Sequence, residues 1–406
     1  IEQNLIFEAR FRVNRIYENP FDPVQADFRG VFVSPDNTVT RVPAFYTRDY
    51  TRRKIGGKEI LDPVSEPFWA VRFCPKVPGN YQWHIQGKDG KGGRFKTPVQ
   101  VLNVKKSDRP GNLTTCGNGK YFAREGRGFL YPVAINICFP VEAHERQKKY
   151  WDFSLPDPEQ GTYLLEEYIN RMSGSGINMG RLWMAPWWGG LEWRRDWEGY
   201  HGLGVYNLRN AWQIDHLIRY AGRKDILIEL ALQNHGPFTT RYDSQWAENP
   251  YNSVNGGPLD RPQQVLTHPE AKRLFRQRLR YTAARWGAFP NLFGWTMWIE
   301  VNVVNSNPRE VESWHREMCA WLRAFDSGKH LISTEFNDDY GMPGVWRLED
   351  IDYTQLAAYN QGSGIIDTLR KTVRGLVSYD KPVLIEEYGG HAQGTNMRFI
   401  AHEIHD

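Results

Sequence analysis

The sequence has little cysteine and none of the motifs in which cysteine usually acts. Its 406 residues include four cysteines, with no Cys-x-x-Cys pair and no Cys/His cluster. Metal centres and thiol redox sites need such spacings, so no metal is expected. Two alternatives stay open for Cys74, Cys116, Cys138 and Cys319, which are one or two disulfides or four buried thiols.

Runs of like charge and long apolar runs are also missing. Lys and Arg number 51 and Asp and Glu number 47, which gives a net charge of +4 with both signs mixed along the chain. Nucleic-acid-binding proteins usually concentrate basic residues in patches, so no nucleic-acid partner is predicted. No apolar stretch approaches the roughly 20 residues of a membrane-spanning helix, and no membrane span is predicted.

Aromatic residues are abundant, and many occupy loop-like stretches. The chain has 16 Trp, 20 Tyr and 20 Phe, and the stretch 185–202, APWWGGLEWRRDWEGYHG, sets Trp beside Gly, Arg and Asp. A core is the usual place for aromatic rings, but this stretch is poorly suited to one. Flat rings stack on the apolar faces of sugars and on nucleobases. Without a basic patch, a carbohydrate is the expected partner.

Two regions of different pattern divide the chain. Residues 1–106 contain short, mostly alternating apolar runs separated by turn sequences such as SPDN and KVPGN. This pattern predicts a small antiparallel β-sandwich. The polar stretch 105–112, KKSDRPGN, contains Pro-Gly and is the expected boundary. Residues 107–406 are expected to form a second domain of the α/β class.

Strand-like and helical runs alternate in the second region. Such repeats predict a parallel sheet with right-handed crossovers, and seven strands favour a (β/α)8 barrel of the TIM type. No Gly-rich phosphate loop follows the first strand, so no dinucleotide cofactor is expected. An eighth strand is not evident, because 394–406 resembles a helix; either the chain is truncated or the barrel closes in another way. The predicted strands are 131–139, 177–184, 225–232, 292–300, 330–336, 352–359 and 382–388, and the predicted helices are 162–172, 207–222, 268–287 and 308–325.

Functional residues of such a barrel lie at the C-terminal ends of its strands. Those ends carry a polar, acidic and aromatic set without a Ser-His-Asp or Cys-His combination. Two facing carboxyl groups are the minimal equipment for glycoside hydrolysis, one protonated to donate to the leaving oxygen and one ionised. The strand-end residues are Asn136, Arg181, Trp183, Asn234, His235, Trp298, Glu300, Asn302, Glu335, Tyr359, Glu386 and Glu387.

Two motifs resemble the retaining glycoside hydrolases of clan A. RWGAFPNLFGWTMWIEVN (285–302) and KPVLIEEYGG (381–390) are similar to strands four and seven of that clan. The resemblance implies that Glu300 is the acid/base and Glu387 the nucleophile. Because successive side chains of a strand alternate faces, Glu386 is expected to point away from the site. Blocks such as GLGVYNLRNAWQIDHLI and NPYNSVNGGP look like a subgroup with an immunoglobulin-like domain before the barrel.

The resemblance also suggests helpers for the two glutamates. An Arg that ends strand two often holds the nucleophile ionised in this clan, which implies that role for Arg181. The strand-six phenol Tyr359 is expected to donate to Glu387. Of four tryptophans that could stack on sugar, at least one is expected in the core. The expected substrate-binding residues are Arg181, Trp183, Asn234, His235, Trp298, Glu335 and Tyr359, with Trp187 and Trp188 as further stacking residues.

Two positions depart from the clan. The residue before the acid/base is usually Asn, which hydrogen-bonds the sugar 2-hydroxyl, and here it is Ile299. Strand six usually carries His two positions before Tyr, and here that position is Ala357. The expected function is retaining hydrolysis of a poly- or oligosaccharide without a cofactor. The alternative is a catalytically altered barrel that binds carbohydrate without cleaving it.

The start of the chain bears on its location. The sequence begins at Ile1 rather than Met and has no apolar leader. Such a start fits an exported protein whose signal has been removed, and it fits a trimmed chain equally well. Together with the resemblance, it predicts a secreted or periplasmic protein.

Overall fold

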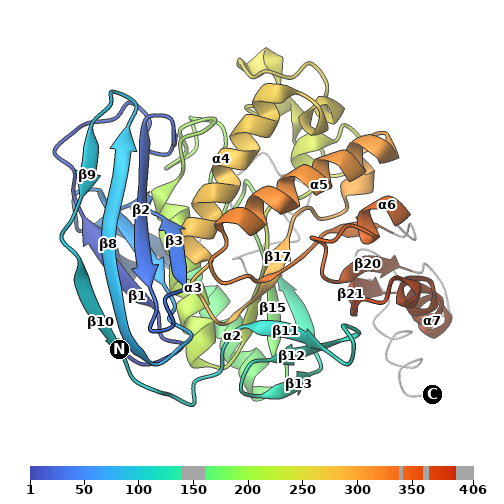
Figure 1. Ribbon diagram of the computed structural model, residues 1–406. Helices are drawn as coiled ribbons and strands as arrows, with labels where there is room; N and C mark the ends of the chain where they lie inside the picture. Colours follow the sequence, from blue (N-terminus) through green and yellow to red (C-terminus); the bar gives the residue numbers. More distant parts are fainter. Residues whose placement is uncertain (139–160, 338–341, 360–364, 390–406) are drawn as a thin grey trace.

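The computed structural model describes residues 1–138, 161–337, 342–359 and 365–389. Strands of the first hundred residues gather at one side of the molecule, blue to cyan in Figure 1. They form a three-stranded sheet, β1-β7-β4, and a five-stranded sheet, β10-β8-β2-β3 with β9 beside β8, while β5 and β6 form a hairpin. The bounds are β1 (Phe7–Phe11), β2 (Ala26–Val33), β3 (Val39–Pro43), β4 (Phe45–Thr47), β5 (Tyr50–Ile55), β6 (Lys58–Pro63), β7 (Phe68–Phe73), β8 (Gly79–Asp89), β9 (Arg94–Lys96) and β10 (Gln100–Val104).

The two larger sheets pack face to face over an aromatic core. Phe28 and Phe32 of β2, Trp69 of β7 and Trp83 of β8 belong to one buried cluster. The rings of Phe32 and Phe73 stack with their centroids 4.1 Å apart. Because side chains alternate along a strand, the apolar alternation of the sequence puts these rings on the inner faces. The assignment to the immunoglobulin-like type stays a prediction.

The parallel strands of the second region follow one another in space in sequence order. β14 to β18 form one sheet and β19 to β21 another, and β18 and β19 together correspond to the fifth predicted strand. No eighth parallel strand pairs with β14 or β21 within the described ranges, so a closed barrel is not shown. The bounds are β14 (Ala134–Ile137), β15 (Met179–Trp183), β16 (Leu227–Ala231), β17 (Leu292–Thr296), β18 (Leu331–Ser333), β19 (Glu335–Asn337), β20 (Thr354–Tyr359) and β21 (Val383–Gly389).

Helices connect these strands, as the repeated pattern predicts. Asn207 caps α3, because its side-chain oxygen accepts from the backbone N–H groups of Arg209 and Asn210 at 3.0 and 3.2 Å. α4 begins at Pro269, where the missing proline N–H costs nothing. The predicted helix 394–406 lies outside the described residues. The bounds are α2 (Thr162–Gly174), α3 (Leu208–Arg223), α4 (Pro269–Trp286), α5 (Pro308–Phe325), α6 (Pro343–Trp346) and α7 (Ile365–Leu376).

The parallel strands separate an apolar layer from a polar interior. Leu182 of β15, Leu230 of β16 and Leu356 of β20 are buried in one cluster with residues of the helices. A small antiparallel sheet of β11 (Leu113–Cys116), β12 (Tyr121–Arg124) and β13 (Gly128–Leu130) lies at the N-terminal ends of these strands. Its Phe122 ring lies 5.0 Å from that of Phe293 and 5.4 Å from that of Tyr353. The opposite, C-terminal end carries the polar residues singled out in the sequence.

A buried ion-pair network joins the N-terminal sheets to the helices. Arg72 of β7 donates to both carboxylate oxygens of Asp215 of α3, at 2.9 and 2.6 Å, and to Glu8 at 2.8 Å. Arg285 of α4 also donates to Asp215, at 3.0 and 2.8 Å. Although burial opposes ionisation, Arg285 and Arg72 hold the pKa of Asp215 below its ordinary value. The two regions therefore pack through compensated charges.

Three of the four cysteines can be described as thiols. Cys74, Cys116 and Cys319 are free thiols, and burial raises the pKa of Cys74 to about 11. Thiolate chemistry at Cys74 is therefore disfavoured at neutral pH.

The lengths and the polarity of the helices bear on membrane spanning. Within the described part of the chain, none is both long enough and apolar enough to cross a membrane.

Candidate active site

Arg181 lies at the centre of a buried polar network inside the parallel strands. Its side chain is 0% exposed, and its Nη1 donates to Glu335 Oε2 at 2.5 Å. Its Nε donates to Asn136 Oδ1 at 2.6 Å, and its Nη2 donates to Glu387 Oε1. Although burial opposes its charge, Glu335, Glu386 and Glu387 raise the pKa of Arg181. One fixed cation thus organises several carboxyl groups.

Glu387 of β21 receives hydrogen bonds from side chains of three other strands. Arg181 of β15 donates to Oε1, and so does Asn136 Nδ2 of β14 at 3.0 Å. The Tyr359 hydroxyl of β20 donates to Oε2, so the contact expected from the sequence is present. Burial and the Glu387 charge raise the pKa of Tyr359, which keeps the hydroxyl a donor. Three donors therefore fix the position of the Glu387 carboxyl group.

The expectation that Glu386 points away from these residues was wrong. In the pairing of β20 with β21, Leu356 lies opposite Ile385 and Ala357 lies opposite Glu387, so Glu386 is an extra residue in a β-bulge. A bulge interrupts the alternation of side chains along a strand. Glu386 therefore turns to the same interior as Glu387.

Glu386 belongs to a buried acidic pair in that interior. Its side chain is 2% exposed, its Oε2 lies 3.3 Å from Arg181 Nε, and its Oε1 accepts from Gln355 Nε2 at 2.8 Å. Burial and the charge and hydrogen bond of Glu229 raise the pKa of Glu386 well above 4.5. Glu229 Oε1 accepts from Tyr353 and Gln355. A proton on Glu386 can then be shared with Glu229.

Glu335 of β19 is a third buried acid beside Arg181. Its side chain is 0% exposed, and within the described residues its Oε1 has no hydrogen-bond partner. Burial, opposed by Arg181 and reinforced by Glu387 and Glu300, raises the pKa of Glu335 well above 4.5. Glu335 was predicted to contact the substrate, but its side chain has no accessible surface. It contacts Arg181 instead.

These raised pKa values predict that stability falls as pH rises. The folded protein holds the protons of Glu335 and Glu386 more tightly than the unfolded chain, so their stabilising contribution is complete below pH 4.5 and is lost as pH rises through the folded pKa values. We expect the melting temperature to decrease above pH 5. Glu386→Gln, which keeps a donor toward Glu229, should flatten this decrease, whereas exposed Glu349→Gln should leave it unchanged. Equal slopes for both variants in melting curves from pH 5 to 9 would contradict this assignment.

Glu300 follows β17 in a conformation that is uncommon for a side chain of its kind. Its φ and ψ are 54° and 46°, in the left-handed region, and strain of this kind gathers at functional sites. Asn337 Nδ2 donates to Glu300 Oε1 at 2.6 Å, and His235 Nδ1 lies 3.0 Å from Oε2. The carboxyl group, 12% exposed, is therefore held on both oxygens.

Asn234 and His235 follow β16 and lie close to the segment that carries Glu300. Asn234 forms an isolated parallel bridge with Ile299, and Asn234 and His235 are both buried residues. His235 reaches the Glu300 carboxyl from this position. Of the two residues, His235 has the clearer chemical partner.

The four tryptophans expected to stack on sugar have different surroundings. Trp183 is half-buried, its Nε1 donates to Asn136 Oδ1 at 3.2 Å, and its ring lies 5.5 Å from the Arg181 guanidinium carbon. Trp298 is 0% exposed and packs on Phe238, Phe275 and Trp314. Its ring therefore has no face open to a ligand. Trp187 and Trp188 are also buried, so Trp183 is the only one of the four with a partly exposed ring.

The two departures from the clan are both buried apolar side chains. Ile299 is 1% exposed and Ala357 is 0% exposed, so neither offers a polar group to a ligand. Amides from other strands lie next to the two glutamates instead, since Asn337 contacts Glu300 and Asn136 contacts Glu387.

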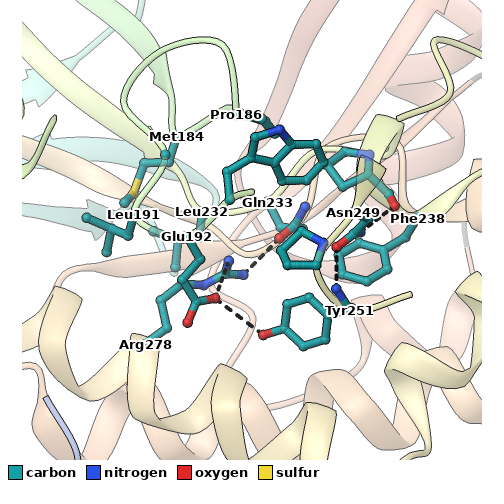
Figure 2. Close-up of a pocket in the computed structure, with 14 residues that line it drawn as sticks. Met184, Pro186, Leu191, Glu192, Leu232, Gln233, Phe238, Asn249, Tyr251 and Arg278 are labelled. Carbon is teal, nitrogen blue, oxygen red and sulfur yellow. Dashed lines mark hydrogen bonds and ion pairs between the residues drawn. The ribbon is translucent and has the colours of Figure 1, made fainter. Parts of the chain in front are cut away.

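A small cavity lies beside these residues, between the segments that follow β15 and β16. Figure 2 shows Glu192, Arg278, Gln233 and Tyr251 around it. Tyr251 donates to Glu192 at 3.3 Å, and Arg278 donates to Gln233 at 2.8 Å. Its volume of ≈30 Å³ accommodates about two waters and is far below that of a ligand pocket. The polar residues that line the cavity thus hold Gln233, which precedes Asn234, in place.

Several residues of the site were not predicted from the sequence. Asn337 lies two positions after Glu335, and the period of two along a strand was a usable signal for it. Glu229 is a lone acid in an apolar run, which also points to a buried pair. Asp243, 3.4 Å from His235 Nε2, lies in a loop without any such signal. Within the described ranges, no group of three or more His, Cys, Asp or Glu side chains is arranged to hold a metal ion.

Comparison with known proteins supports the architecture. Residues 1–88 match a family described as a domain of unknown function, DUF5060, and none of the curated proteins matched the chain. A candidate glycoside hydrolase from Bacteroides vulgatus ATCC 8482 aligns with a TM-score of 0.59 at 15% identity, over 94% of this chain and 63% of that one. A glycoside hydrolase family 5 mannosidase from Rhizomucor miehei, in mutant form, aligns with a TM-score of 0.50 at 16% identity, over 69% of this chain and 73% of that one.

The likeness to these two solved structures is one of fold. The chain spans 63% of the length of the Bacteroides protein, and at 15–16% identity the likeness concerns the fold. The chain therefore has a fold found in glycoside hydrolases.

Proposed function

We propose that the chain is a glycoside hydrolase that retains anomeric configuration. Glu300 protonates the leaving oxygen while Glu387 attacks the anomeric carbon, which forms a glycosyl-enzyme and releases the first product. Glu300 then removes a proton from water, which attacks the same carbon and frees Glu387. No metal or organic cofactor takes part in this mechanism.

The arrangement around Glu387 supports this proposal most strongly. Donors from β14, β15 and β20 converge on one partly exposed carboxylate. A nucleophile must be aimed at the anomeric carbon, and three convergent donors fix the position of this carboxyl group. Glu300 is held differently, by an amide and an imidazole. Two carboxyl groups in unlike surroundings suit the unlike roles of acid and nucleophile.

A second function remains a candidate because of two buried residues. Ile299 and Ala357 cannot donate hydrogen bonds where the clan uses Asn and His. A site without those donors loses interactions that strengthen in the transition state. The alternative is a barrel that binds carbohydrate without cleaving it, through Trp183 and the polar strand ends.

A glycan panel separates the two functions. The wild type should release reducing sugar from at least one plant, algal or bacterial glycan or aryl glycoside, with mannosides included because one structural relative is named a mannosidase. Proton NMR of the first product should show the anomer of the substrate. An inverted product would overturn the retaining mechanism. Binding in isothermal titration without product from any glycan would favour the binding protein.

The location and the partners of the protein are further proposals. Secretion or transport to the periplasm is proposed from the clan resemblance. A carbohydrate is the proposed partner. Fractionation of the native host with an antibody against the chain would test the location.

A further inference from the structure

A short loop carries an acidic residue toward the ring of His235. The segment 239–245 folds back after the turn at Gly236–Phe238, and Gln245 N donates to Gly236 O at 2.9 Å. A Cβ at Gly236 would lie 2.8 Å from the carbonyl oxygen of Asp243, so glycine permits this close approach. Ser244 Oγ donates to Thr239 O at 2.7 Å and ties the loop to itself.

His235 lies between two carboxyl groups from different segments. Its Nδ1 is 3.0 Å from Glu300 Oε2, and its Nε2 is 3.4 Å from Asp243 Oδ2. Neither contact has the alignment of a hydrogen bond, so the attraction is one of charge. Although burial disfavours a cation, Asp243 and Glu300 together raise the pKa of His235 to about 10. The ring nitrogens thus face one acid each.

Both acids have unusual backbone conformations. Asp243 has a φ of 48° and Glu300 a φ of 54°, in a region that residues other than glycine seldom adopt. The exposed fraction also differs among the three side chains, and it is 36% for Asp243, 7% for His235 and 12% for Glu300. The three side chains therefore form a line from the partly exposed Asp243, through the buried His235 ring, to Glu300, the proposed acid/base.

We propose that Asp243 is a positioning residue that keeps His235 cationic, and that this cation holds the Glu300 carboxyl in the orientation needed for proton transfer. The inference rests on the proposed function for its catalytic part. Asp243 touches neither the reacting atoms nor Glu300 and acts through the ring. Among the described residues, the charged groups that face His235 are Asp243 and Glu300, and Glu335 is the next acid beyond Glu300.

The first test reads the ring directly and needs no substrate. In protein labelled with 15N-histidine, the His235 signal is identified by its loss in His235→Gln. The wild-type signal should remain that of an imidazolium at pH 8, well above the ordinary value of 6.5. Asp243→Asn should lower the titration midpoint by about 1–3 pH units, and Glu300→Gln should lower it as well. Asn adopts the left-handed region as readily as Asp, so the loop is preserved.

The second test uses leaving groups, on the sugar that the glycan panel identifies. Asp243→Asn should slow cleavage of glycosides with poor leaving groups by about tenfold, because they need a well-placed acid. Dinitrophenyl glycosides should be cleaved at the wild-type rate. Asp260→Asn, an exposed acid on another loop, is the matched control and should change neither rate. Melting curves verify that both variants fold.

The outcomes separate this proposal from the proposed function. A neutral His235 at pH 7 in the wild type, or an unchanged midpoint in Asp243→Asn, would overturn it. If Asp243→Asn slowed the cleavage of glycosides with good and with poor leaving groups equally, Asp243 would have a structural role only, and its positioning role would be overturned. If no glycan is cleaved, the proposed function fails, and the NMR midpoints alone decide whether Asp243 keeps His235 cationic beside Glu300.

Discussion

Glu387→Gln is expected to cleave the substrate of the wild type at least on the order of 10³-fold more slowly. The amide keeps the size of the carboxyl group but cannot attack the anomeric carbon. Its oxygen can still accept from Arg181, and its NH2 group can donate to the Tyr359 hydroxyl oxygen, so the fold should persist. Initial rates under saturating and limiting substrate separate the effect on kcat from that on KM. A nucleophile acts in the transition state, so kcat should fall.

A covalent label identifies the residue that attacks. A 2-deoxy-2-fluoro glycoside of the substrate sugar should add one glycosyl mass to the wild type, and fragmentation should place it on Glu387. Glu349→Gln, an exposed substitution of the same kind, is the control and should be labelled normally. A label on Glu386 would transfer the nucleophile to the bulged neighbour, which shares the contact with Arg181. Normal turnover by Glu387→Gln would refute the mechanism.

Arg181→Met is expected to lower the free energy of unfolding by about 3–5 kcal/mol. The side chain is 0% exposed and contacts Glu335 at 2.5 Å and Glu386 at 3.3 Å, besides Glu387. Removing the cation leaves buried carboxyl groups without their partner, and each must be desolvated alone or take up a proton. The loss should therefore be smaller at pH 5 than at pH 8, because protonation relieves it.

Denaturant unfolding at the two pH values checks this expectation. Arg316→Met is the matched control, since Arg316 is 65% exposed and pairs with Glu312 on the surface of α5. An exposed pair of this kind is worth about 0.3–0.5 kcal/mol. Arg181→Lys should fall between the two, because an ammonium group replaces the charge but not the planar fork. A loss below about 1 kcal/mol for Arg181→Met would mean that the carboxyl groups are already neutral.

The fold was largely predictable because its signals are local. The apolar runs at 177–184 and 225–232 became β15 and β16, and the Asn207 cap lies at the start of α3 as predicted. Such signals depend on side chains a few residues apart, which a sequence displays. The division of the chain near residue 106 and the immunoglobulin-like type stay predictions. A closed barrel also stays a prediction, because closure depends on strand pairing far along the chain.

The site was predictable in its residues but less so in their orientation. Arg181, Tyr359 and Glu387 were expected together, and the structure brings them into contact. Trp298 was expected at the ligand, but it fills the core. A tryptophan at a strand end suits either place, and only the surrounding helices decide between them.

The sequence by itself determined the strand–helix alternation, the acids at the strand ends and the absence of a cysteine or phosphate-loop motif. Those features depend only on the types of residue and on their spacing along the chain. The tertiary structure alone decided that Glu386 turns inward, because the bulge opposite Leu356 and Ala357 is a property of two paired strands. It also decided that Asp243 reaches His235, because a loop and a strand end meet only after folding. Spacing along a chain predicts which face a side chain occupies, whereas register and loop closure decide what that face contacts.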